Sequence, residues 1–85
     1  MNPYLVNAHL ADLGARLAAN GPRAVEHELA ELARIARQRG VAHTARTVMV
    51  DRSASRVVRE RAFGVVSSAL VNARRAGAPA MARAS

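Results

Sequence analysis

The stretch SRVVRERAFGVVSSALVNARR, residues 55–75, decides how this chain folds. Its apolar residues recur every three or four positions in two adjoining stripes, which is the spacing of one face of an α-helix. The first stripe is Val58, Ala62, Val65 and Ala69, and the second is Phe63, Val66, Leu70 and Ala73. Together they make an arc wide enough to contact two neighbours at once. We therefore predict a long C-terminal helix over about 54–76, against which the rest of the chain packs.

Upstream of this stretch the sequence predicts an N-terminal helical hairpin. Apolar residues recur every three or four positions twice, at Val6, Leu10, Leu13 and Leu17 and again at Val25, Leu29, Leu32 and Ala36. Asn20-Gly21 and Gly40 supply the residues that favour a left-handed helix end, and Pro22 suits the first turn of a helix. We place the two helices at about 3–19 and 22–39. Because the turn between them is short, they should lie antiparallel.

Residues 41–50, VAHTARTVMV, permit two interpretations. The β-branched residues favour a strand. Strict alternation fails, however, at Val48, Met49 and Val50, and a single strand has no partner within the chain. We therefore favour a short helix over about 42–50, and the alternative is a strand that pairs with a second subunit. In either case the fold class is all-α, a small helical domain over 1–76 followed by a disordered tail over 77–85.

The length and composition of the chain favour self-association. A single domain of 85 residues buries only roughly 60% of the surface of its unfolded chain. Twenty residues are Ala, and Tyr4 and Phe63 are the two aromatic residues, so the core has little apolar area per residue. We expect a homodimer, in which the C-terminal helix buries further apolar surface.

Basic residues are concentrated in the middle of the sequence. All 13 are Arg, and eight of them fall between Arg34 and Arg61 against two of the six acids, so this stretch carries +6 of the net charge of +7. Such a block predicts an anionic partner. We expect the protein to bind DNA or RNA through an Arg-rich surface. The candidate nucleic-acid or anion-binding residues are Arg34, Arg37, Arg46, Arg52, Arg56 and Arg59.

The alternative function is a protein–protein interaction module or adaptor. In this interpretation the apolar arc of the C-terminal helix is an oligomer interface, and the arginines meet an acidic protein partner. The candidate interface residues are Val58, Ala62, Val65, Val66, Ala69 and Leu70. Gly64, with Ser68 four residues later, would either let another backbone approach closely or avoid a clash with a neighbouring side chain.

Catalysis and membrane insertion find no support in the sequence. His9, His27 and His43 are isolated from one another, and no phosphate-binding or nucleophile motif is present, so we expect neither an enzyme nor a cofactor or metal site. The chain has no Cys, which excludes disulfides and thiolate zinc sites. It also has no run of about 18 apolar residues, so we expect no membrane span. The first residues do not resemble a signal peptide, and we expect a cytoplasmic protein.

Overall fold

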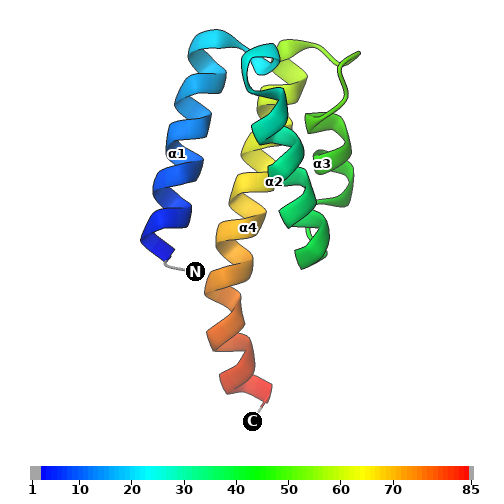
Figure 1. Ribbon diagram of the computed structural model, residues 1–85. Helices are drawn as coiled ribbons and strands as arrows, with labels where there is room; N and C mark the ends of the chain where they lie inside the picture. Colours follow the sequence, from blue (N-terminus) through cyan, green and yellow to red (C-terminus); the bar gives the residue numbers. More distant parts are fainter. Residues whose placement is uncertain (1–2, 85) are drawn as a thin grey trace.

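Four α-helices and one 3-10 turn form the part of the chain that the structure describes, which is the backbone of residues 3–84 and the side chains of residues 9–73. The structure is a computed structural model. The elements are α1 (Pro3–Asn20), η1 (Pro22–Val25), α2 (Glu26–Arg39), α3 (His43–Met49) and α4 (Arg56–Ala84). Successive helices run in opposite directions, and the C-terminal part of α4 projects beyond the other three (Figure 1). The all-α fold class is confirmed.

The helical hairpin ends where the sequence predicts. Gly21 and Gly40 have positive φ values of 83° and 68°, which glycine adopts without the steric penalty of a side chain. At the C-terminal end of α2, Val41 N–H donates to the carbonyl of Ala36 at 3.1 Å, and Gly40 N–H donates to the carbonyl of Arg37 at 3.0 Å. These bonds satisfy carbonyls that the last turn of α2 leaves unpaired.

The segment 41–50 forms α3, so the helical interpretation is confirmed, and no strand occurs among residues 3–84. Met49 explains the outcome, because its side chain is fully buried in the core. A helix also satisfies its own backbone hydrogen bonds, whereas a lone strand leaves its backbone groups unpaired.

The core lies where α1, α2 and α3 meet α4. Its most deeply buried large side chains come from all four helices and the 3-10 turn: Leu13, Leu17, Val25, Leu29, Met49 and Val66. Phe63 packs beside Gly14, where an added Cβ would lie 3.1 Å from the Phe63 ring. A larger residue in place of Gly14 would therefore displace α1 or the ring. As the sequence predicts, α4 is the common partner of the other helices.

The C-terminal end of α4 differs from the prediction. We expected the helix to end near 76, yet its backbone continues to Ala84 through Pro79. Proline has no N–H, so one backbone hydrogen bond is lost there. Alanine, which alternates with other residues along this segment, is the strongest helix former and offsets part of that loss. The predicted disorder of 77–85 stays a prediction. None of the helices in the described region is long and apolar enough to cross a membrane.

Replacing Met49 by Ala should lower the free energy of unfolding by about 3 kcal/mol, because it removes a fully buried side chain and leaves a cavity. Urea unfolding followed by circular dichroism measures the change. Thr44→Ala, at an exposed position of the same helix, is the matched control and should change the value by less than about 0.5 kcal/mol. Equal effects of the two substitutions would contradict the burial of Met49.

Candidate anion-binding surface

Arg59, one of the predicted binding residues, is a buried structural side chain. Only 2% of its surface is exposed. Its Nε donates to the carbonyl of Met49 at 3.0 Å, and its Nη1 donates to Glu26 Oε2 at 3.0 Å, while Nη2 contacts the other oxygen of the same carboxylate. Met49 ends α3 and Glu26 begins α2, so this one guanidinium ties both helices to α4.

Arg56, one turn earlier in α4, caps the C-terminal end of α1. Its Nη2 donates to the carbonyl of Ala18, and its Nε lies 3.7 Å from Glu60. The last turn of a helix leaves its carbonyls without partners and carries a partial negative charge. Arg56 and Arg59 therefore supply hydrogen bonds and positive charge to the ends of α1 and α3.

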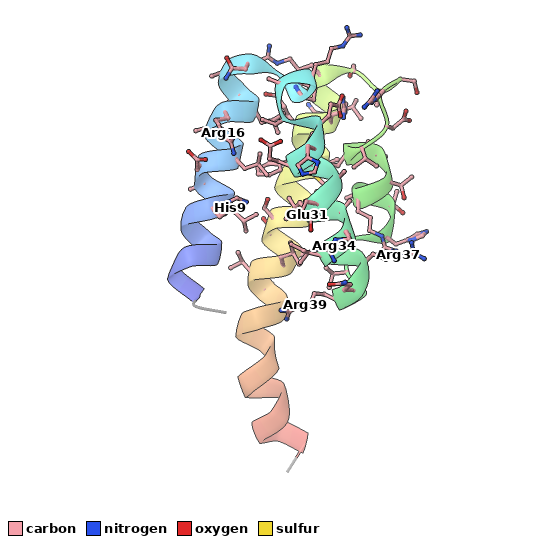
Figure 2. All side chains as sticks on the ribbon, viewed as in Figure 1. His9, Arg16, Glu31, Arg34, Arg37 and Arg39 are labelled. Atoms are coloured by element: carbon pink, nitrogen blue, oxygen red, sulfur yellow. The ribbon has the colours of Figure 1, made fainter. Side chains whose placement is uncertain are left out.

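The structure does not bring the six candidate arginines together on one surface. Arg59 is removed from the set, because an external anion cannot reach it. The other five lie at opposite ends of the bundle. Arg52 and Arg56 flank the start of α4, next to the start of α2, whereas Arg37 lies about 16 Å further along α2. Figure 2 shows Arg34 and Arg37 toward the lower end of that helix.

The lower end carries a group of arginines around the turn between α2 and α3. Arg37 and Arg39 are exposed in the last turn of α2. Arg46, on α3, folds back so that its Nη1 donates to the carbonyl of Val41 at 3.1 Å and its Nη2 lies 3.0 Å from His43 Nδ1. We call Arg37, Arg39 and Arg46 the turn cluster. Arg39 was not among the predicted residues, although its position just before the helix-ending Gly40 marks it as exposed.

Ion pairs with arginines neutralise most of the acidic side chains. Arg16 lies 3.1 Å from Asp12 and 2.9 Å from Glu28, and Arg34 pairs with Glu31. Glu26 is held by Arg59, and Glu60 lies near Arg56. Within the described side chains, the arginines that have no carboxylate within ion-pairing distance are Arg23, Arg37, Arg39, Arg46 and Arg61. Arg52 lies 3.9 Å from Glu26 but is 81% exposed, so this contact contributes little.

Hydrogen bonds favour the charged forms of Glu26, Glu31 and Asp51. Hydrogen bonds from Arg59 lower the pKa of Glu26, and they outweigh the effect of burial, which raises it. Hydrogen bonds from Arg34 lower the pKa of Glu31 in the same way. The pKa of Asp51 is lowered by the hydrogen bonds that it accepts from the side chain and backbone of Ser53. These carboxylates are therefore ionised at neutral pH and remain paired.

The predicted oligomer interface contains both buried and exposed residues. Ala62, Val66 and Leu70 lie in the core of the domain and are at most 6% exposed, so they cannot contact another molecule. Val58 and Val65 are 44% and 55% exposed. A third exposed valine, Val57, was not predicted. Ala69 is half-buried.

Gly64, also on α4, has nothing within 4 Å of the position of an added Cβ, so it avoids no clash within the described chain. Across the described side chains, no three of the residue types His, Asp and Glu gather in a position to hold a metal ion.

Glu26→Gln should lower the free energy of unfolding by about 3 kcal/mol at neutral pH, because it leaves the buried charge of Arg59 without its counter-ion. A carboxylate whose pKa is lowered in the folded state contributes stability above its unfolded pKa, and this contribution is lost as the pH falls through the folded pKa. The stability of the parent protein should therefore fall below about pH 4.3, and that of the variant should fall less steeply.

Urea unfolding between pH 7 and pH 2 measures both effects. Asp12→Asn is the matched control, because Asp12 forms an ion pair that is exposed. The ion-pair assignment is wrong if Glu26→Gln and Asp12→Asn have the same stability at neutral pH.

Comparison with protein-family models, with curated proteins and with solved structures found no match to this chain.

Proposed function

We propose that this protein binds nucleic acid, DNA or RNA, by contacting the phosphate backbone. The observation that carries the proposal is the charge distribution. Five of the six acids lie within ion-pairing distance of arginines, and Asp51 is bonded to Ser53. The excess positive charge therefore lies on arginines that have no carboxylate partner among the described side chains. Clustered exposed arginines attract polyanions and release their condensed counter-ions.

The turn cluster is the strongest candidate for these contacts. Arg37 and Arg39 are exposed on different sides of the last turn of α2. Arg46, which is half-buried on α3, adds positive charge near the same turn. Arg23 and Arg52 form a second, smaller group at the opposite end of the bundle. Arg34 contributes less than predicted, because Glu31 neutralises it.

The proposed contacts are to phosphates rather than to bases. Base stacking requires exposed aromatic rings, and Phe63, the one aromatic residue among the described side chains, is half-buried beside Gly14. We therefore propose binding with little sequence preference, and a binding rather than a catalytic role. The cytoplasmic location that the sequence led us to expect is compatible with this role and stays a prediction.

Binding to a 20-base-pair duplex should weaken steeply between 50 and 200 mM salt, since each neutralised phosphate contributes a slope of about −0.9 to the logarithm of the affinity against the logarithm of the salt concentration. The double variant Arg37→Gln/Arg39→Gln should reduce this slope by about 2. Fluorescence anisotropy measures both.

Arg16→Gln is the control, because it removes an arginine from an ion-paired position. It should leave the slope unchanged. An affinity that does not depend on salt would overturn the proposal, and an unchanged slope in the double variant would exclude the turn cluster.

The exposed valines of α4 favour a second candidate function, an interaction module. Val57, Val58 and Val65 are between 44% and 57% exposed on one helix. Burial of apolar surface drives most protein association. In this second proposal the chain forms a homodimer through α4, and the arginines are free to meet an acidic partner.

A further inference from the structure

The acidic residues of the chain are confined to two stretches, and the rest of the sequence after Glu31 is purely basic. All six acids fall within residues 12–31 or 51–60. The acid-free stretches 32–50 and 61–85 contain eight arginines. They supply the turn between α2 and α3 and all of α4 after its first turns, and α4 leaves the bundle at the same end as that turn (Figure 1). One end of the bundle therefore gathers positive charge.

The ion pair between Glu26 and Arg59 fixes how far along α4 the turn cluster lies. It joins the start of α2 to the first turn of α4, and the two helices run in the same direction from there (Figure 1). Arg39 and Asn72 each lie thirteen residues further on, so both are about 20 Å beyond the ion pair. Arg74 and Arg75 follow Asn72 within one turn of α4. The turn cluster and these two residues are therefore at one level of the bundle.

Beyond this level α4 continues alone. We call residues 74–84 of α4 the arm, and it projects past the other helices that the structure describes (Figure 1). Eleven residues of helix are about 16 Å long. Apart from its three arginines, the sequence of the arm consists of Ala, Gly, Pro and one Met. Short residues make a narrow helix, so the arm is both slender and cationic.

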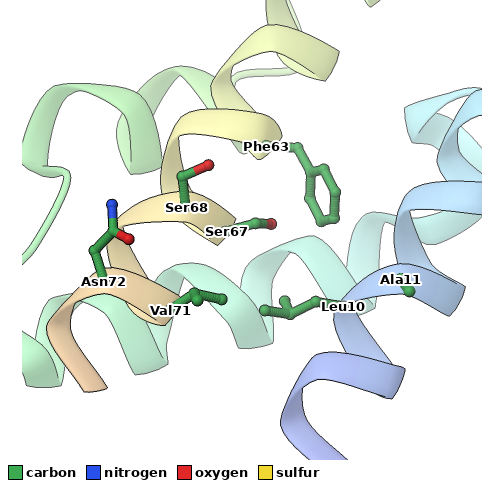
Figure 3. Close-up of a pocket in the computed structure, with 7 residues that line it drawn as sticks. All are labelled: Leu10, Ala11, Phe63, Ser67, Ser68, Val71 and Asn72. Carbon is green, nitrogen blue, oxygen red and sulfur yellow. The ribbon is translucent and has the colours of Figure 1, made fainter. Parts of the chain in front are cut away.

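The side of α4 that faces α1 offers no contact to a phosphate. An open groove of about 390 Å³ lies there. Its lining includes Leu10, Phe63, Ser67, Ser68, Val71 and Asn72 (Figure 3). None of the described residues in this lining is charged, whereas the turn cluster lies on α2 and α3. A polyanion is therefore attracted to the α2 and α3 side of the bundle, at the base of the arm.

We propose that the partner is double-stranded DNA and that the arm lies in its major groove. The major groove of B-form DNA is about 12 Å wide and admits an α-helix. The arm then carries Arg74, Arg75 and Arg83 between the two phosphate backbones, where a cation is attracted by both strands. The turn cluster, at the base of the arm, contacts the phosphates of the strand that α4 crosses as it leaves the groove.

The same geometry excludes double-stranded RNA as the preferred partner. The major groove of an A-form RNA duplex is deep and narrow, and side chains cannot read it. A helix therefore cannot enter it, and the turn cluster alone has to hold an RNA duplex. This inference rests on the nucleic-acid binding proposed above, and it names one form of nucleic acid as the partner.

A comparison of DNA and RNA duplexes of the same 20-base-pair sequence tests the arm. Fluorescence anisotropy at one salt concentration should show DNA bound about tenfold more tightly than RNA. Arg74→Gln/Arg75→Gln should bring the two affinities close together. Arg16→Gln/Arg61→Gln is the matched control, because it removes the same charge away from the arm and the turn cluster, and it should keep the preference for DNA. Circular dichroism checks that both variants fold like the parent.

A modified duplex tests the groove itself. Replacing every cytosine by glucosylated 5-hydroxymethylcytosine fills the major groove with sugar and leaves the phosphates unchanged. The parent protein should bind this DNA about tenfold more weakly than ordinary DNA. Arg74→Gln/Arg75→Gln should show a smaller difference between the two. Equal affinity of the parent protein for both duplexes would overturn the placement of the arm.

The outcomes separate this inference from the proposal on which it rests. Equal, salt-dependent affinities for DNA and RNA would overturn the major-groove arm and leave phosphate binding in place. A preference for DNA that survives in Arg74→Gln/Arg75→Gln would also overturn the role of the arm. No binding to either duplex would overturn both proposals.

Discussion

Arg59 carries a positive charge at a position where 2% of its surface is exposed, and the arrangement of the helices depends on how that charge is compensated. Removing a guanidinium from water costs several kcal/mol unless an opposite charge and further hydrogen bonds replace the water. Glu26 supplies the charge with both of its oxygens, and the carbonyl of Met49 supplies the remaining acceptor. A buried ion pair of this kind adds little net stability compared with a well-packed apolar substitute. We infer that it specifies which helix ends meet.

The core around this ion pair is built from small and medium side chains. Its fully buried positions are occupied by Leu, Val, Ala and Met, and Phe63 is the one described aromatic residue packed against it. A domain with such a core has a small free energy of unfolding, since each buried large apolar side chain contributes only roughly 1.5–3 kcal/mol. The polar contacts at the start of α4 therefore matter more here than in a larger domain. They hold the C-terminal ends of α1 and α3 and the N-terminal end of α2 close together.

The helices could be predicted from the sequence because their signals are local. Apolar spacing, together with Gly21 and Gly40, determines where the first two helices lie and end, and the structure follows these signals. One difference is that the predicted helix over 22–39 begins with the 3-10 turn η1 and is α-helical only from Glu26. For 41–50 the local signals were mixed. The helix is favoured by the burial of Met49 in the core, which depends on residues far away in the sequence. The continuation of α4 beyond 76 was not predicted, because Arg74, Arg75 and Gly77 have the pattern of a helix end and no apolar periodicity follows them.

The candidate site was predicted less well, for a physical reason. The spacing of Arg56 and Arg59 shows that they share a side of the helix, but not what that side faces, and Arg52 lies before the helix begins. Arg59 lies three residues before Ala62 and seven before Val66, which are both buried, so it continues the core stripe. That spacing would have identified it as inward-facing. The separation of Arg37 from Arg52 depends on helix direction and could not be inferred from composition or charge.

The two arginines at the start of α4 also have a consequence for the order in which the domain forms. Arg56 contacts a residue 38 positions earlier, and Arg59 contacts one 33 positions earlier. A chain that has been synthesised only as far as α3 therefore lacks the groups that close the ends of α1 and α3 and that neutralise Glu26. Loops of this length must close before these contacts form, which slows folding relative to local contacts. We expect the nascent chain to remain open until α4 has left the ribosome, and then to fold in a single step.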